Sequence, residues 1–163
     1  ERLEVDPEAG RALVAEAHEE AKAALKEIRD LVRGIHPVIL EDRGLDAALS
    51  AIVARSPVPV RLDIDVAERP SAAVESTAYF VVAEALTNVA KHSQARMASV
   101  RLVERDGLLI VEVHDDGIGG ASETADGGLR GLRDRVASME GRLRIASPAG
   151  GPTVLSVELP CAS

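Results

Sequence analysis

Three polar residues recur at helical spacing within one apolar segment of the chain: Glu84, Asn88 and His92. Residues four apart lie on the same face of a helix, so these side chains would form a row that Lys91 borders. The flanking residues are apolar on nearly every side, which predicts a buried helix. An unpaired buried polar group costs about 1–3 kcal/mol, and Mg²⁺ with phosphates would supply partners for a carboxylate and an amide. The alternative is a solvated helix edge with ordinary i,i+4 pairs.

A second pattern lies at the end of a predicted strand over 108–115, whose alternate residues are apolar and whose last residue is Asp115. If the apolar face is the core face, Asp115 ends inside an apolar pocket. Its carboxylate could there accept a hydrogen bond from the exocyclic amino group of adenine. Gly117 and Gly119 would let the backbone approach a ligand closely. The alternative is an ordinary turn, since Asp-Gly is common after strands.

A third pattern is the glycine-rich turn Gly127-Gly128-Leu129-Arg130-Gly131-Leu132, which leads into a predicted helix. A helix N-terminus presents free N–H groups and partial positive charge, which suit phosphate. Residues 116–127 before it are small and polar and could form a mobile lid. The turn is not a P-loop, because no Gly-Lys-Ser/Thr follows. The alternative is a helix-start loop without a ligand.

The composition limits the other classes of function. The 163 residues carry a formal net charge of -8, which disfavours direct nucleic-acid binding. Cys161 is the single cysteine, so an internal disulfide and a Cys/His metal cluster are excluded, and a reducing, cytoplasmic compartment is expected. No apolar run is long enough to span a bilayer. Because the chain begins with Glu1 rather than Met, we expect a fragment of a longer protein, whose membrane anchor is left open.

The predicted elements add up to an α+β fold, a two-layer sandwich in which helices cover one face of a mixed sheet. A long N-terminal helix precedes it, with a heptad seam of apolar residues that has no partner in the chain. Ser71 is expected to cap the central helix, with Glu75 as a local capping partner. The expected helices cover 7–33, 45–55, 71–93 and the residues from the glycine-rich turn to 139, and the strands cover 58–66, 98–104, 108–115, 142–146 and 153–159.

In this order, the three patterns resemble the ATP-binding domain of sensor histidine kinases. That fold, called GHKL or Bergerat, is shared with gyrase-type, mismatch-repair, heat-shock-chaperone and anti-sigma-factor ATPases. Residues 83–92 resemble the N box, 115–119 the first glycine box and 128–132 the second, although Asp126 stands where a glycine usually opens the second box. The tripeptide Gly151-Pro152-Thr153 resembles a closing Gly-x-Thr.

The resemblance implies that the ligands are ATP and Mg²⁺. Asn88 would ligate the metal, and Glu84 would act through a metal-bound water or as a base. At the other end of the nucleotide, Asp115 would read adenine and Thr153 would help to hold a water beside it. Lys91 and His92 would face the phosphates, and Gly128, Gly131 and the helix start after them would cradle the phosphates. The other implied nucleotide-binding residues are Gly117, Gly119, Leu129 and Leu132.

Residues 27–45 resemble the second dimerisation helix and linker of the nitrate-sensor-like subfamily, whose partners are often DNA-binding response regulators. The resemblance implies that residues 1–36 are the second helix of an incomplete dimerisation and phosphotransfer hairpin, and that residues 37–163 are the catalytic domain. Neither His18 nor His36 is expected to be the phosphoacceptor.

The implied enzyme is a protein histidine kinase, a homodimer at full length. It would transfer the γ-phosphoryl group of ATP to a histidine outside this chain, for relay to a response-regulator aspartate. The alternative function is a nucleotide-gated binding module such as an anti-sigma factor, against which the heptad helix argues. A third possibility, a scaffold that no longer binds ATP, is disfavoured by the intact Glu84, Asn88 and Asp115.

Overall fold

A computed structural model of the chain describes residues 38–121 and 128–161. The chain divides into two compact units, Glu1–His36 and Pro37–Ser163, and all described residues belong to the second. The predicted heptad helix, both histidines considered as acceptors, Asp126 and residues 122–127 of the predicted lid lie outside the described residues.

Five described strands form one mixed sheet in the order β1-β2-β3-β5-β4. Strand β1 is parallel to β2, and the other neighbouring pairs are antiparallel. Buried and exposed residues alternate along β3, so one face of the sheet meets the core and the other meets solvent. The strands are β1 (Val60–Asp65), β2 (Ala98–Arg105), β3 (Leu108–Asp115), β4 (Arg142–Ala146) and β5 (Thr153–Pro160).

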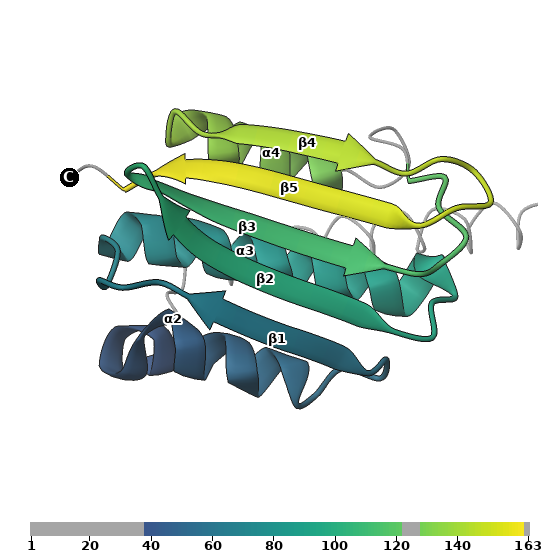
Figure 1. Cartoon of the computed structure of the whole chain (residues 1–163), viewed down its shortest axis with the longest axis horizontal. Helices are drawn as coiled ribbons and strands as arrows, with labels where there is room; N and C mark the ends of the chain where they lie inside the picture. The colour runs from purple at the N-terminus through teal and green to yellow at the C-terminus, as the bar shows by residue number, and fades with distance from the viewer. Residues whose placement is uncertain (1–37, 122–127, 162–163) are drawn as a thin grey trace, which may run out of the picture. The chain divides into compact units, whose positions relative to one another are not determined.

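Helices pack on one face of this sheet, with α3 and α4 behind it in Figure 1 and α2 beside β1. The buried core between the two layers is aliphatic, built of Leu, Val and Ala side chains. The predicted α+β sandwich with a mixed sheet is therefore confirmed. None of the helices in the described ranges is long and apolar enough to cross a membrane. The helical elements are α2 (Val38–Val53), α3 (Ala72–Asn88), the π-helix η1 (Val89–Ser93) and α4 (Gly128–Ser138).

Helix α2 begins earlier than the predicted helix over 45–55, so that boundary was wrong. A helical turn over 38–43 precedes Gly44, whose φ of 75° and ψ of -177° interrupt the helix. A positive φ favours glycine, which explains why this residue stands at the kink. Leu40 in the extra turn is fully buried, and its burial holds the turn against the core.

The N-terminus of α3 is capped by Ser71, as predicted, because its Oγ accepts a hydrogen bond from Val74 N at 3.4 Å. The predicted capping role of Glu75 is wrong. This carboxylate is 2% exposed and accepts two bonds of 2.9 Å from Arg69 Nε and Nη2, which raise the pKa of the guanidinium. Glu75 stands one residue beyond the position from which a capping-box glutamate reaches back. Arg69 Nη2 also donates to Leu40 O at 2.8 Å, so the pair joins α2 to α3.

The predicted long helix over 71–93 changes character after Asn88. The next five residues form η1, a π-helix that ends at Gln94 with a left-handed φ of 53°. Ser93 Oγ donates to Val89 O at 2.8 Å and accepts from Ala95 N at 3.0 Å, which fixes the end of this turn. A π-turn is wider than an α-turn, so residues 89–93 depart from the regular α-helical geometry that the sequence spacing assumes.

Candidate functional site

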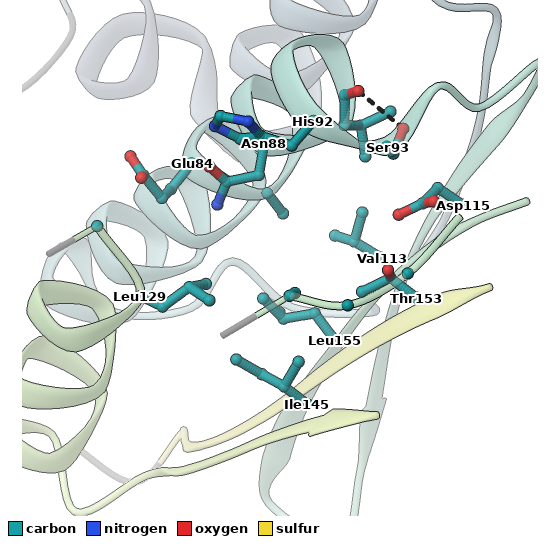
Figure 2. A pocket seen from close by; sticks show the side chains of 16 residues that line it. Glu84, Asn88, His92, Ser93, Val113, Asp115, Leu129, Ile145, Thr153 and Leu155 are labelled. Atoms are coloured by element: carbon teal, nitrogen blue, oxygen red, sulfur yellow. Dashed lines mark hydrogen bonds between the residues drawn. The ribbon is translucent and has the colours of Figure 1, made fainter. Parts of the chain in front are cut away.

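A cavity of about 330 Å³ opens between α3, the start of α4 and the adjoining ends of β3 and β5 (Figure 2). Its volume falls at the lower end of the range for small-molecule sites. The lining combines apolar side chains with a few polar groups, as expected for a ligand pocket. It consists of Glu84, Ala85, Asn88, Val89, His92, Ser93, Val113, Asp115, Gly119, Gly120, Ala121, Gly128, Leu129, Ile145, Thr153 and Leu155.

The predicted polar row reaches this pocket. Glu84 and Asn88 line the cavity from α3, and His92 lines it from η1 (Figure 2). Lys91 is exposed and is not among the lining residues. Glu84, Asn88 and His92 therefore line one pocket at the predicted four-residue spacing, whereas Lys91, in the same π-helix as His92, does not.

Asp115 closes the far end of the pocket from the last position of β3. Its side chain is on the core face and the residue is 4% exposed. One carboxylate oxygen, Oδ1, accepts a hydrogen bond from Gly117 N at 2.9 Å. Among the described residues no group donates to Oδ2, and Figure 2 shows the carboxylate beside the cavity, close to Thr153. A buried carboxylate with one unused oxygen is suited to accept a hydrogen bond from a ligand.

The two glycines of the first glycine box, Gly117 and Gly119, have different roles. Gly117 does not line the pocket, and a Cβ there would lie 2.6 Å from Asp115 Oδ1 and 2.8 Å from Ser93 Cβ. Its lack of a side chain therefore serves the packing beneath Asp115. Gly119 does line the pocket, with a φ of 61°, and a Cβ on it would overlap Pro148 O. The predicted close approach to a ligand thus fits Gly119 better than Gly117.

The second glycine box contributes its first two residues to the cavity, Gly128 and Leu129. A Cβ on Gly128 would overlap Glu84 Oε1 and lie 3.1 Å from Glu84 Cδ. The absence of a side chain at the start of α4 therefore leaves the space that the Glu84 carboxylate occupies. Gly131 is exposed and Leu132 is 5% exposed within the core, and neither lines the pocket.

The loop between β4 and β5 supplies features that the sequence did not reveal. Ser147 O accepts from Gly120 N at 3.1 Å, and Gly150 N donates to Ile118 O at 2.7 Å. The Ser147 side chain accepts from Ala121 N at 3.0 Å and shares a 2.9 Å hydrogen bond with Thr153 Oγ1. These contacts hold the segment after β3 against the hairpin, and no sequence periodicity reports such loop-to-loop bonds.

Asp116, next to the buried Asp115, points away from the pocket. Its Oδ1 accepts from Met97 N at 2.9 Å and from Arg96 N at 2.8 Å. The pKa of this carboxyl is lowered, chiefly by the hydrogen bond from Met97 N and to a smaller extent by that from Arg96 N. The two adjacent aspartates therefore differ in role, since Asp116 holds the segment before β2 next to the end of β3, and Asp115 faces the cavity.

Comparison with known proteins places this geometry in a family. Residues 73–163, which hold every pocket-lining residue, match the family described as histidine kinase-, DNA gyrase B-, and HSP90-like ATPase. The chain belongs to this ATPase family. The family predicted from the three sequence motifs is thereby confirmed, and membership supports ATP as the ligand of the pocket.

Relatives of this ATPase chain include named sensor histidine kinases. Sensor histidine kinase NarS of Mycobacterium tuberculosis is 35% identical over 167 residues, which cover 95% of the chain and 37% of NarS. Nitrate/nitrite sensor protein NarX of Escherichia coli K12 is 30% identical over 159 residues, covering 93% of the chain and 26% of NarX. The chain therefore spans a minor part of the length of these relatives.

A solved structure shows the same fold at lower identity. The histidine kinase domain of the blue-light activated histidine kinase from Erythrobacter litoralis EL346 is 22% identical, with a TM-score of 0.58. The match covers 73% of the ATPase chain and 62% of that domain. The arrangement of the mixed sheet and its helices is therefore that of a histidine kinase ATPase domain.

The charges of the ATPase pocket restrict how a triphosphate can be held. Two carboxylates, those of Glu84 and Asp115, line the cavity, and no lysine or arginine is among its described lining residues. Within the described ranges no group of three or more His, Cys, Asp or Glu residues is arranged to hold a metal ion by itself. The donors fit Mg²⁺, which accepts one or two protein oxygens and completes its shell with water and phosphate oxygens.

Proposed function

We propose that the chain is the ATP-binding catalytic region of a sensor histidine kinase, which transfers the γ-phosphoryl group of ATP to a histidine outside this chain. The observation that carries the proposal is the shared pocket. Glu84 and Asn88 reach it from α3, and Asp115 reaches it from the end of β3. The fold belongs to an ATPase family, and the relatives NarS and NarX are a sensor histidine kinase and a nitrate/nitrite sensor.

The base of the nucleotide is assigned to the deep end of the cavity. Asp115 Oδ2 would accept a hydrogen bond from the exocyclic amino group of adenine, since Oδ1 is already used by Gly117 N. Apolar side chains of three strands, Val113, Ile145 and Leu155, form the wall that would contact the flat faces of the purine. A carboxylate cannot accept from the carbonyl that guanine carries at the same position, so this end favours adenine.

The phosphates are assigned to the end where α3 meets α4. Bound there, Mg²⁺ would neutralise negative charge on the phosphates. This is necessary because two carboxylates, and no Lys or Arg, are among the described residues that line the pocket. Asn88 Oδ1 is the proposed protein ligand, and Glu84 would either hold a metal-bound water or accept a proton. His92 and the N–H groups at the start of α4, from Gly128, would face the phosphates. Lys91 and Gly131 would reach them only after a local rearrangement.

The rest of the reaction involves parts beyond the described residues. We assign residues 1–36 to the second helix of a dimerisation and phosphotransfer hairpin, and residues 37–163 to the catalytic domain. The full-length protein would be a homodimer of the nitrate-sensor-like subfamily that passes the phosphoryl group to a response-regulator aspartate. A cytoplasmic location is proposed for the catalytic region, consistent with its free Cys161.

The test uses γ-labelled ATP with Mg²⁺ and the purified chain. The expected result is that the chain binds ATP without labelling itself, and labels a supplied helical hairpin of the full-length protein that bears the acceptor histidine. Efficient labelling of the chain alone, or no transfer to the hairpin, would contradict the proposal.

A matched pair of substitutions on α3 makes the test residue-specific. Asn88→Ala should lower the rate of transfer at least about tenfold, because it removes the proposed metal ligand. Thr87→Ala is the control, since Thr87 is exposed and its hydroxyl only donates to Ala83 O at 2.7 Å. Equal losses in both variants would show that the effect belongs to the helix rather than to the site.

A further inference from the structure

Ser147 links the segment after β3 to the wall of the pocket through its side-chain hydroxyl. It follows the last residue of β4 and is not itself a lining residue. Its Oγ accepts from Ala121 N at 3.0 Å and lies 2.9 Å from Thr153 Oγ1. Both partners line the pocket, so one half-buried hydroxyl connects two separate parts of its surface.

The hydrogen bond that Ala121 N donates to Ser147 Oγ favours one direction for the bond between the two hydroxyls. A serine hydroxyl has one hydrogen and two lone pairs, and Ala121 N–H uses one lone pair. Donation into an oxygen polarises its own O–H and makes it a better donor. Ser147 O–H is therefore expected to donate to Thr153 Oγ1, which leaves the hydrogen of Thr153 directed at a ligand in the pocket.

Thr153 lies where its hydroxyl hydrogen would reach the base of the proposed nucleotide. It is the register partner of Asp115 across β3 and β5, and such directly opposed side chains lie about 4.5–5.5 Å apart at Cβ. Figure 2 shows both at the same end of the cavity. A purine whose amino group donates to Asp115 places a ring nitrogen, an acceptor, next to the amino group. Thr153 as a donor would then match the ring nitrogen, and Asp115 as an acceptor would match the neighbouring amino group of the same base.

We infer that Ser147 is a positioning residue for base recognition: it holds Thr153 as a hydrogen-bond donor toward a ring-nitrogen acceptor of the purine, directly or through one water. This inference rests on the proposed function, because it assumes that the pocket binds ATP. Removing the hydroxyl should leave the loop in place, since Ser147 O and Gly150 N make their own backbone bonds to Gly120 N and Ile118 O.

The experiment measures ATP–Mg²⁺ affinity by calorimetry in a double-mutant cycle. Ser147→Ala and Thr153→Val, which keeps the shape of the threonine, should each lower affinity about two- to tenfold, the effect of one net hydrogen bond. The double variant should lose no more than the weaker-binding single variant, because the hydroxyls act as one chain. Ser147→Thr, which keeps the hydroxyl, should bind like the unmodified chain. The inference would be overturned if the double variant lost affinity by the product of the two single losses. It would also be overturned if Ser147→Ala kept full affinity.

A second readout separates base recognition from a general structural effect. The 1-deaza and 7-deaza analogues of ATP each replace one ring nitrogen near the amino group by CH. With one of them, Ser147→Ala should bind as tightly as the unmodified chain, since the acceptor is already missing. A loss that is equal for ATP and both analogues would overturn the inference.

The control variant is Ser156→Ala, on the same strand as Thr153 and in register with the exposed Glu112, outside the pocket lining. It should leave the affinity unchanged. If the unmodified chain itself failed to bind ATP, the proposed function would fall first and this inference with it. Unchanged affinity in Ser147→Ala alone would remove only the inference.

Discussion

Replacing Gly128 by alanine separates catalysis from folding. A Cβ at this position would overlap Glu84 Oε1 and lie 3.1 Å from Glu84 Cδ. The three heavy atoms nearest to this Cβ all belong to the Glu84 side chain. The obstacle is the end of a flexible side chain, so the carboxylate can be displaced without moving the backbone of α3. Alanine is also a better helix former than glycine by up to about 1 kcal/mol, less at a terminal position such as this one.

The expected result is a chain that melts at the same or a slightly higher temperature and is a poor enzyme. Displacing Glu84 by about 1 Å is enough to lower the rate of phosphoryl transfer about a hundredfold, because such catalysis depends on positioning. ATP affinity should change far less, since the base end of the pocket is formed by Asp115 and Thr153 on other elements. Single-turnover transfer to the supplied hairpin measures the rate, and calorimetry measures the affinity.

A Glu84→Ala background provides the control. Once the carboxylate is gone, adding Gly128→Ala should lower the rate no further, because the two changes act on the same group. The reasoning would be refuted by a Gly128→Ala variant with an unchanged rate. It would also be refuted by a rate that falls a further hundredfold in the Glu84→Ala background.

Three further predictions concern groups outside the pocket. Arg69→Met leaves the buried Glu75 without its cation and should lower the melting temperature by at least about 5 °C, whereas Arg101→Met, which removes an exposed pair, should change it little. The lowered pKa of Asp116 means that its stabilising effect is complete above the ordinary value of 3.8 and is lost as the pH falls through the lower folded value. Asp116→Asn should therefore flatten the loss of unfolding free energy in that acid range, as measured by urea titrations at several pH values. Burial raises the pKa of the Cys161 thiol, so iodoacetamide at pH 8 should modify it more slowly in the folded chain than after unfolding.

The sequence was sufficient for the elements whose side chains follow a regular period. Strands β3 and β4 have the predicted bounds, because apolar residues alternate along them and turns stand at their ends. The same period placed Asp115 on the core face, and the four-residue period placed Glu84 and Asn88 toward one side of α3. The site was therefore predictable to the extent that it is built from regular elements.

What the sequence could not show depends on contacts between distant segments. The turn before Gly44 is held by burial of Leu40 and by a bond from Arg69, which no local pattern reveals. The spacing of polar residues indicates neither the π-helix η1 nor the exclusion of Lys91 from the pocket lining. Ser147 acts across two loops, so only its three-dimensional neighbours identify it.

The buried carboxylate of Asp115 at the end of β3 is proposed to bind the amino group of adenine in ATP, and the Asp115→Asn variant measures this contact. Asparagine keeps an oxygen to accept from Gly117 N, so the fold should survive, but it directs an NH₂ group at the amino group of adenine. Affinity for ATP should fall at least about tenfold, or 1.4 kcal/mol, while the neighbouring Asp116→Asn binds normally. Equal ATP affinity in Asp115→Asn and the unmodified chain would contradict the claim.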